Sequence, residues 1–246
     1  MTNILVPNIE QVADYGSEQL WVARVAIGVP KIARSALDPK TGDTFADTFG
    51  PLYLELNYAF LAYRSLQGKL LKYERDKEYS NLYEHLWTAY KDRLPKVVKV
   101  LGFDIGFLFK KDTQFEAESL AYFASHNLPS DLRRMMKQDR RLWQQGLADF
   151  RNLYRQHQTV GPEIEKVWFT PRCAEVIFDS VWQAIEDIIV KLLDAKLQAE
   201  SHGLMIWEIP EEDREPSCPE RFRLGLSEVA LKSLRDSIEG SSSSNS

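Results

Sequence analysis

The amino-acid sequence predicts an all-α fold, an up-and-down bundle of helices with further helical segments before and after it. Apolar residues recur at spacings of three and four over five long stretches, which is the period of an α-helix. Each stretch is bounded by a capping residue or by glycine and proline, and alternating patterns typical of strands are nearly absent. The expected helices cover residues 51–75, 79–93, 113–126, 130–158 and 171–202.

Length and composition fit one large globular domain with additions. The chain has 246 residues, of which 44% are hydrophobic and 27% charged. We expect the bundle to occupy residues 51–203. Residues 1–50 are expected to form an extension or a wrap over it, with a short helix over 17–27 and a loop over 38–43. Residues 204–239 are expected to form an acidic loop and a surface helix over 227–238, followed by a serine-rich tail over 240–246 that is too polar to fold.

The first two predicted helices carry apolar faces that are typical of a core. The first begins at Gly50 and Pro51, because proline is tolerated in the first turn, and its charged end lies over residues 73–77. The second ends before Pro95, with a further turn expected after it. His85 lies beside core positions of this second helix, and we interpret it as a packing or surface residue rather than a ligand.

The apolar run over residues 103–109 has no period that assigns it to a helix or a strand. Two interpretations remain open, a buried turn or an exposed interface patch. The next helix, over 113–126, is capped by Asp112 or Thr113. The last long helix begins at Thr170 and Pro171, and its broad apolar band indicates the most buried member of the bundle.

The helix over 130–158 brings apolar and basic residues together near its end. At about 100° per residue, its apolar face includes Trp143, Phe150 and Tyr154, and one heptad beyond Phe150 that face reaches His157. Arg151 and Arg140 lie at the border of the face. The net charge is −5, which argues against a protein that coats nucleic acid nonspecifically. Residues 131–157 nevertheless carry a local charge of +4, and residues 205–220 a local charge of −5.

Two interpretations of the basic stretch remain open. It is either a solvated helix face or an electrostatic seat for an RNA backbone. Two interpretations of Arg151 and His157 also remain open. Either Arg151 forms an ion pair with an acid while His157 packs in the core, or both residues belong to a functional site.

Arg151, Asn152 and His157 resemble the R-x(4–6)-H motif of the HEPN superfamily (higher eukaryotes and prokaryotes nucleotide-binding), in which a polar residue commonly follows the arginine. The resemblance covers roughly residues 113–203. It implies a HEPN-like bundle and a metal-independent endoribonuclease that often forms a homodimer. By this resemblance Arg151, Asn152 and His157 are the catalytic residues. Arg140, Arg141 and Arg155 are expected to bind the RNA substrate.

The chemistry of RNA cleavage suits these residue types. A 2′-hydroxyl attacks the adjacent phosphorus, which needs a base with a pKa near neutrality and a cation for the developing phosphoryl charge. However, Arg151 and His157 are six residues apart, and on an ideal helix their side chains point about 120° away from each other. They converge only if the helix unwinds near Gln158 or if the site is shared between two chains. The alternative function is a non-catalytic helical module that binds a nucleotide, RNA or a protein partner in a defence or regulatory system.

The remaining motifs exclude several other classes. Cys173 and Cys218 form neither a metal-type pair nor a disulfide framework, and no phosphate-binding, dinucleotide-binding or zinc-protease motif is present. No apolar run has the length of a membrane span or the pattern of a signal peptide. We therefore expect a cytoplasmic protein with no cofactor, no bound metal and no membrane association.

Overall fold

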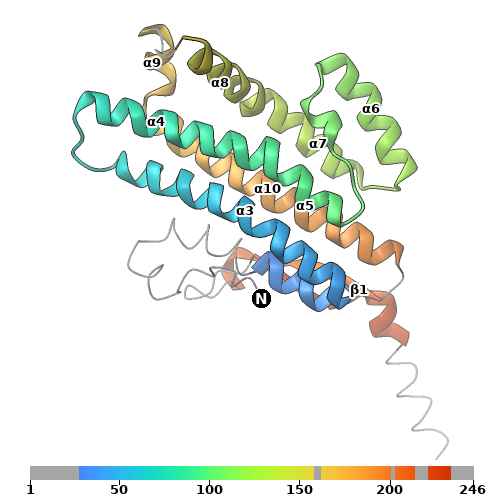
Figure 1. Cartoon of the computed structure of the whole chain (residues 1–246). Helices are drawn as coiled ribbons and strands as arrows, with labels where there is room; N and C mark the ends of the chain where they lie inside the picture. The colour runs from blue at the N-terminus through green and yellow to red at the C-terminus, as the bar shows by residue number, and fades with distance from the viewer. Residues whose placement is uncertain (1–27, 158–161, 201–202, 214–220, 234–246) are drawn as a thin grey trace, which may run out of the picture.

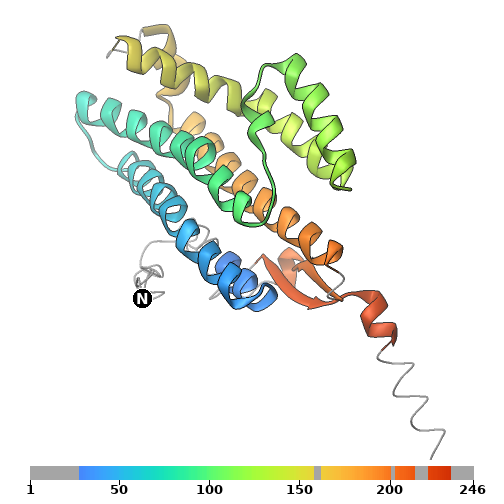
Figure 2. The ribbon, with the colours of Figure 1, turned by 45° about the vertical axis from the view of Figure 1, so that its right-hand side comes forward.

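The all-α class is confirmed by a computed structural model, which describes residues 28–157, 162–200, 203–213 and 221–233. Long helices dominate these residues, and the strands among them form a single two-stranded sheet. Helices α3, α4 with α5, and α10 lie side by side, and α7 and α8 run along the other side of α10 and α4 (Figures 1 and 2). Helix α6 packs outside α7.

The elements occupy ranges that differ from several of the expected ones. Their bounds, in chain order, are α3 Pro39–Ser65, α4 Lys72–Trp87, η1 Thr88–Arg93, α5 Leu94–Val100, η2 Gly106–Phe109, α6 Asp112–Ser125, α7 Ser130–Asp139, η3 Arg140–Gln144, α8 Gln145–His157, α9 Pro162–Trp168, α10 Pro171–Ala199, β1 Leu204–Glu208, η4 Glu211–Asp213 and β2 Phe222–Leu226. The ends of α6 and α10 lie close to the predicted ends.

Helix α3 begins earlier than predicted, and the loop expected over residues 38–43 is wrong. The carboxylate of Asp38 accepts a hydrogen bond from the backbone N–H of Thr41 at 3.1 Å, and Pro39 occupies the first turn. Pro51 consequently lies inside the helix rather than at its start. Residues 28–36 are also helical, so the predicted helix end at residues 28–30 is wrong. The helix expected over residues 17–27 lies outside the described residues.

Helix α4 begins seven residues earlier than predicted, because the charged segment over residues 73–77 starts this helix instead of ending α3. The Glu74 carboxylate accepts a hydrogen bond from the backbone N–H of Leu71 at 2.9 Å, which satisfies one of the free donors at the helix start. The helix then continues through the π-helical turn η1 and across Pro95 into α5. Residues 94–100 are thus part of a longer helical rod.

The predicted helix over 130–158 is present as α7, the π-helical turn η3 and α8, which follow one another without a break to His157. A π-helical turn contains one more residue than an α-helical turn and therefore rotates every later residue around the axis. Residues after η1 or η3 therefore lie on a different face of the helix from the one that a uniform rotation of 100° per residue would predict.

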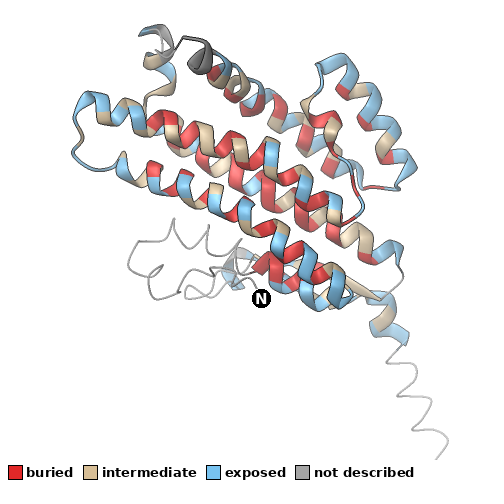
Figure 3. Ribbon diagram, viewed as in Figure 1, coloured by how far each residue is buried: buried red, intermediate tan, exposed pale blue. Residues whose placement is uncertain are grey.

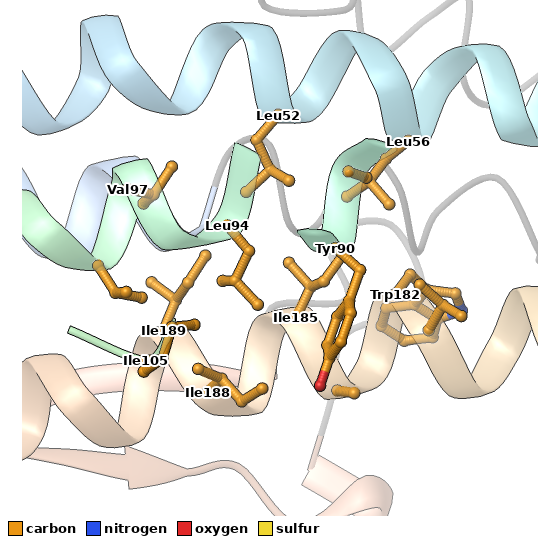
Figure 4. Close-up of a cluster of buried hydrophobic side chains, with 14 of the residues drawn as sticks. Leu52, Leu56, Tyr90, Leu94, Val97, Ile105, Trp182, Ile185, Ile188 and Ile189 are labelled. Atoms are coloured by element: carbon orange, nitrogen blue, oxygen red, sulfur yellow. The ribbon is translucent and has the colours of Figure 1, made fainter. Parts of the chain in front are cut away.

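The core lies between α10 and the helices around it, as Figure 3 shows by the buried faces that they turn toward one another. Leu52 and Leu56 of α3 approach Leu94 of the α4–α5 rod, and Ile185 and Ile188 of α10 complete the cluster (Figure 4). All five side chains are completely buried. The prediction that the last long helix is among the most buried is therefore correct.

A β-hairpin occupies part of the region that was predicted to be an acidic loop. Strands β1 and β2 pair antiparallel, with Ile206 opposite Leu224, and the buried side chains of Ile206 and Phe222 extend the core. Arg221 links the hairpin to α10 through two ion pairs, with Asp187 at 2.8 Å and with Glu186 at 3.4 Å. The expectation of loop and helix alone is wrong here, since short apolar segments that lack a clear period became strands through tertiary contact. Residues 228–233 are helical, within the surface helix expected over 227–238.

Truncation of Ile185 tests the central position of α10. We expect Ile185→Ala to lower the free energy of unfolding by about 2–5 kcal/mol, because a completely buried side chain leaves a cavity. The matched control is Val176→Ala on the same helix, where the side chain is 42% exposed, and its change is expected to stay below about 1 kcal/mol. Chemical denaturation measures both values, and equal losses would contradict the arrangement of the core.

Candidate functional site

The end of α8 that carries the candidate residues is positioned by an aromatic cluster. The buried ring of Phe150 lies 4.9 Å from that of Tyr83 on α4 and 5.3 Å from that of Trp168 on α9, measured between centroids. The hydroxyl of Tyr83 donates a hydrogen bond to the backbone carbonyl of Trp168 at 2.5 Å. Trp168 also packs so closely on Gly146 that a Cβ there would lie 3.0 Å from the indole. These contacts hold α8, α9 and α4 together.

Arg151 follows Phe150 directly and is half-buried, whereas Asn152 is exposed. The Nε atom of Arg151 is buried without a hydrogen-bond acceptor, and no ion pair to an acid is present for this arginine within the described ranges. The side chains of Arg155 and His157 lie outside the described residues. The structure therefore places Arg151 at the border between core and surface, as predicted, and leaves its guanidinium with unused donors.

The backbone between Arg151 and His157 is α-helical, since α8 extends without interruption to His157. Six residues of regular helix direct two side chains about 120° apart. Unwinding near Gln158 concerns residues outside the described part. Within α8 itself, the helix does not bring the two residues together.

The basic stretch before the motif is partly neutralised by two acids from α6. Glu116 forms ion pairs with Arg133, at 2.7 Å, and with Lys137. Asp112 forms an ion pair with Arg140 at 2.7 Å. Arg134 and Arg141 remain exposed. The local charge of +4 that the sequence indicates is thus reduced by neighbours that only the fold brings close.

Arg140 serves the interior of the protein instead of an open surface. Its side chain is 5% exposed, and its guanidinium donates hydrogen bonds to the backbone carbonyl of Leu108 and, at 2.8 Å, to that of Lys110. Gln144 donates to the same Leu108 carbonyl at 2.6 Å and accepts from the hydroxyl of Tyr90 at 3.3 Å. We name this group, Tyr90 with Leu108, Arg140 and Gln144, the polar junction. Its placement leaves Arg140 without access to a substrate.

The polar junction also decides between the two interpretations of the apolar run over residues 103–109. Ile105, Phe107 and Leu108 are buried, and η2 lies against α6. The run is therefore a buried turn rather than an exposed patch. The buried backbone carbonyl of Leu108 is satisfied by the side chains of Arg140 and Gln144 in η3, as buried polar groups require.

Asp139 is a second polar group at this place that sequence analysis did not single out. Burial raises the pKa of its carboxyl group to about 7, and the nearby carboxylate of Asp187 adds to the shift. Its Oδ2 atom is buried without a hydrogen-bond partner in the described part of the chain. The next turn contributes Trp143, whose ring lies 4.7 Å from that of Tyr90. A carboxyl group with such surroundings is expected to be substantially protonated near neutral pH.

A cluster of three charged or titratable side chains lies between α3 and the α4–α5 rod. Nδ1 of His85 lies 2.8 Å from Oε2 of Glu55, and Arg93 donates to Oε1 of the same carboxylate at 3.3 Å. Eight residues along a regular helix would set Arg93 about 80° from His85. The additional residue in η1 turns it back by about 100°, onto nearly the same face. Because this depends on η1, the sequence carried no signal for the cluster beyond its residue types.

Neither metal nor membrane features mark the described residues. No group of three or more histidine, cysteine and acidic side chains there is arranged to hold a metal ion. None of the helices described has the length and apolar character that crossing a membrane requires. Comparisons with protein-family models, with curated proteins and with solved structures give no significant match to this chain.

Replacement of Arg140 distinguishes its internal role from a surface role. We expect Arg140→Ala to lower the free energy of unfolding by about 2–4 kcal/mol, because it removes the hydrogen bonds of the guanidinium to the carbonyl groups of Leu108 and Lys110 and leaves a cavity in the interior. The neighbouring Arg141→Ala is the matched control, since Arg141 is exposed, and its change should stay within about 0.5 kcal/mol. Thermal or chemical denaturation measures both. A similar small loss for the two variants would show that Arg140 is not part of the core.

The raised pKa of Asp139 predicts a pH-dependent stability. Below pH 4 the carboxyl group is protonated in both the folded and the unfolded protein, so it contributes no difference. As the pH rises from about 4 toward 7, the unfolded state ionises first, and the folded state loses stability by up to about 4 kcal/mol. Asp139→Asn should remove this loss, so that its advantage over the natural protein grows with pH.

Urea denaturation at several pH values measures the effect, with Asp149→Asn, an exposed acid of α8, as the control. An advantage of Asp139→Asn that stays constant between pH 4 and 7 would contradict the assignment.

Proposed function

We propose that this protein is a HEPN-type endoribonuclease that cleaves RNA without a metal ion, with Arg151 and His157 as its central pair. The observation that carries the proposal is the guanidinium of Arg151. It is half-buried, it lies beside a rigid aromatic cluster, and its Nε is without an acceptor in the part of the chain that the structure describes. An arginine with unused donors at a fixed position is suited to hold a phosphate group.

The regular helix of α8 favours a site that is shared between two copies of the chain. Positions 151 and 157 lie about 120° apart around a regular helix, which favours a site where each residue faces the phosphate group from a different chain. Across a two-fold axis, Arg151 of one copy and His157 of the other face each other if the α8 ends meet. A homodimer is therefore part of the proposal, and the buried turn over residues 103–109 is not its interface.

In the proposed reaction the 2′-hydroxyl oxygen of the RNA attacks the adjacent phosphorus, and the bond from phosphorus to the 5′-oxygen breaks. His157 takes the proton of the 2′-hydroxyl as general base. Arg151 stabilises the negative charge that develops on the two non-bridging oxygens. The exposed amide of Asn152 orients the phosphate group. The departing 5′-oxygen takes up a proton from water, and the products are a 2′,3′-cyclic phosphate and a 5′-hydroxyl group.

A second function is favoured by the ion pairs of the basic stretch. Because Arg133, Lys137 and Arg140 form ion pairs with acids of α6, three of the seven basic side chains of the stretch are already paired, which weakens its attraction for an RNA backbone. This arrangement supports a non-catalytic helical module that binds RNA, a nucleotide or a protein partner. Of the residues proposed to bind substrate, Arg141 is exposed and available to either function.

RNA cleavage tests the proposal directly. We expect cleavage of single-stranded RNA that persists in EDTA, leaves a 2′,3′-cyclic phosphate and spares DNA, which lacks the attacking hydroxyl. Loss of a general base lowers rates by about a hundred- to ten-thousand-fold, so His157→Ala and Arg151→Ala should each nearly abolish cleavage. His126→Ala and Arg134→Ala, exposed residues outside the motif, serve as matched controls. Cleavage that survives both motif variants would assign the activity to another site or to a contaminant.

Mixing the two inactive variants tests whether the site is shared. Random exchange of subunits makes half of the dimers mixed, and each mixed dimer keeps one site with both residues intact, so about a quarter of the original activity should return. No recovery, together with a dimer by light scattering, would place both residues in one chain. A folded dimer that cleaves no RNA would support the binding module instead.

A further inference from the structure

The Glu55, His85 and Arg93 cluster lies at the surface and has donors that the fold does not use. The side chain of Glu55 is 15% exposed, whereas those of His85 and Arg93 are 33% and 34% exposed. Each partner holds one oxygen of the carboxylate, so the imidazole and the guanidinium are neighbours on one face. Tyr58, one turn after Glu55 on α3, is 48% exposed, and its ring lies 5.2 Å from that of His85.

The hydrogen bonds of the cluster fix the orientation of its two cationic groups. When neutral, His85 donates its Nδ1 proton to Glu55, which leaves Nε2 as the free ring nitrogen. Arg93 uses one terminal nitrogen for Glu55, and its Nε is buried without an acceptor in the described ranges. Most of the five guanidinium donors thus have no acceptor among the described residues, and they lie beside a partly exposed histidine.

The charges around His85 determine which ligand fits. With neutral His85, the charges of Arg93 and Glu55 cancel, and protonation of His85 makes the cluster +1. Tyr58 and Glu55 face the imidazole from α3. On the α4–α5 rod, Glu84 directly precedes His85 in the sequence, and Asp92 directly precedes Arg93. The ammonium of Lys91 lies over the Trp87 ring at 5.3 Å. A ligand with negative charge therefore gains most when His85 carries a proton.

We propose that this cluster is a second site, separate from Arg151, that binds a phosphate monoester carrying an aromatic group. Arg93 and protonated His85 donate hydrogen bonds to the phosphate oxygens, and the exposed ring of Tyr58 packs against the aromatic group. Glu55 holds both donors in place and keeps the empty site neutral.

Side-chain NMR spectra of the histidines, recorded on the full chain, test this proposal with phenyl phosphate as the probe. We expect phenyl phosphate to shift the His85 signals, inorganic phosphate to shift them at higher concentration, and phenol to leave them unchanged. The signals of His126, which follows the last residue of α6 and lies beside Tyr122, provide an internal reference.

Two variants separate the binding site from a merely structural link between α3 and α4. Arg93→Gln should weaken phenyl phosphate binding at least tenfold, since it removes a charge-assisted hydrogen bond. Arg75→Gln, an exposed arginine on the same rod, is the matched control. Tyr58→Ala removes an exposed ring, and it should abolish the preference for phenyl phosphate over inorganic phosphate while inorganic phosphate still binds.

Two results would overturn the proposal: unchanged His85 signals, or equal shifts with phenol. If Arg93→Gln fails to fold, the Tyr58→Ala comparison still decides whether the ligand lies here.

Discussion

The architecture depends on the polar junction, where side chains of η3 bind the backbone carbonyl of Leu108. An unpaired carbonyl in the interior costs free energy comparable to a lost hydrogen bond, so the turn over residues 103–109 stays buried only with Arg140 and Gln144 in place. Gln144 in turn meets the hydroxyl of Tyr90 in η1. One group of hydrogen bonds therefore connects both π-helical turns with the buried turn and holds the α7–α8 layer to the α4–α5 rod.

The same junction constrains where function can lie. The guanidinium of Arg140 is unavailable to a ligand, because it donates hydrogen bonds to backbone carbonyl groups. It also forms an ion pair with Asp112 on its more exposed side. Glu116 of α6 likewise forms ion pairs with Arg133 and Lys137. Within the described residues, Arg151 near the end of α8 and Arg93 at the end of η1 each have a buried Nε without an acceptor, and these are the two arginines that we propose for binding.

Both π-helical turns change which residues meet. In η1 the additional residue brings Arg93 onto the face of His85, so that Glu55 bridges the two. In η3 it lies where Arg140 and Gln144 point inward and Arg141 points outward. Such turns often occur at functional positions in helical proteins. Here η1 contributes Tyr90 to the polar junction and Arg93 to a candidate ligand site on the opposite side of the same rod.

Much of the fold, and less of the candidate site, could be predicted from the sequence. The three-and-four spacing of apolar residues determined the all-α class, the burial of α10 and the inward direction of Phe150, because helical period and burial are local properties of the pattern. The half-buried position of Arg151 followed from the same period. The start of α3 was missed, although Asp38 and Pro39 are themselves helix-start signals, because the glycine and acids after them favoured a loop.

Only the tertiary structure decided how the charged residues are used. Arg140 and Arg141 are adjacent in sequence, yet one is buried against Leu108 and the other exposed, because η3 shifts the helical face and a distant turn supplies acceptors. The hairpin of β1 and β2, the ion pairs of Glu116 and the bridge from Glu55 to His85 likewise join segments far apart in the chain. Pairing between distant side chains leaves no periodic trace, whereas helix formation and burial do.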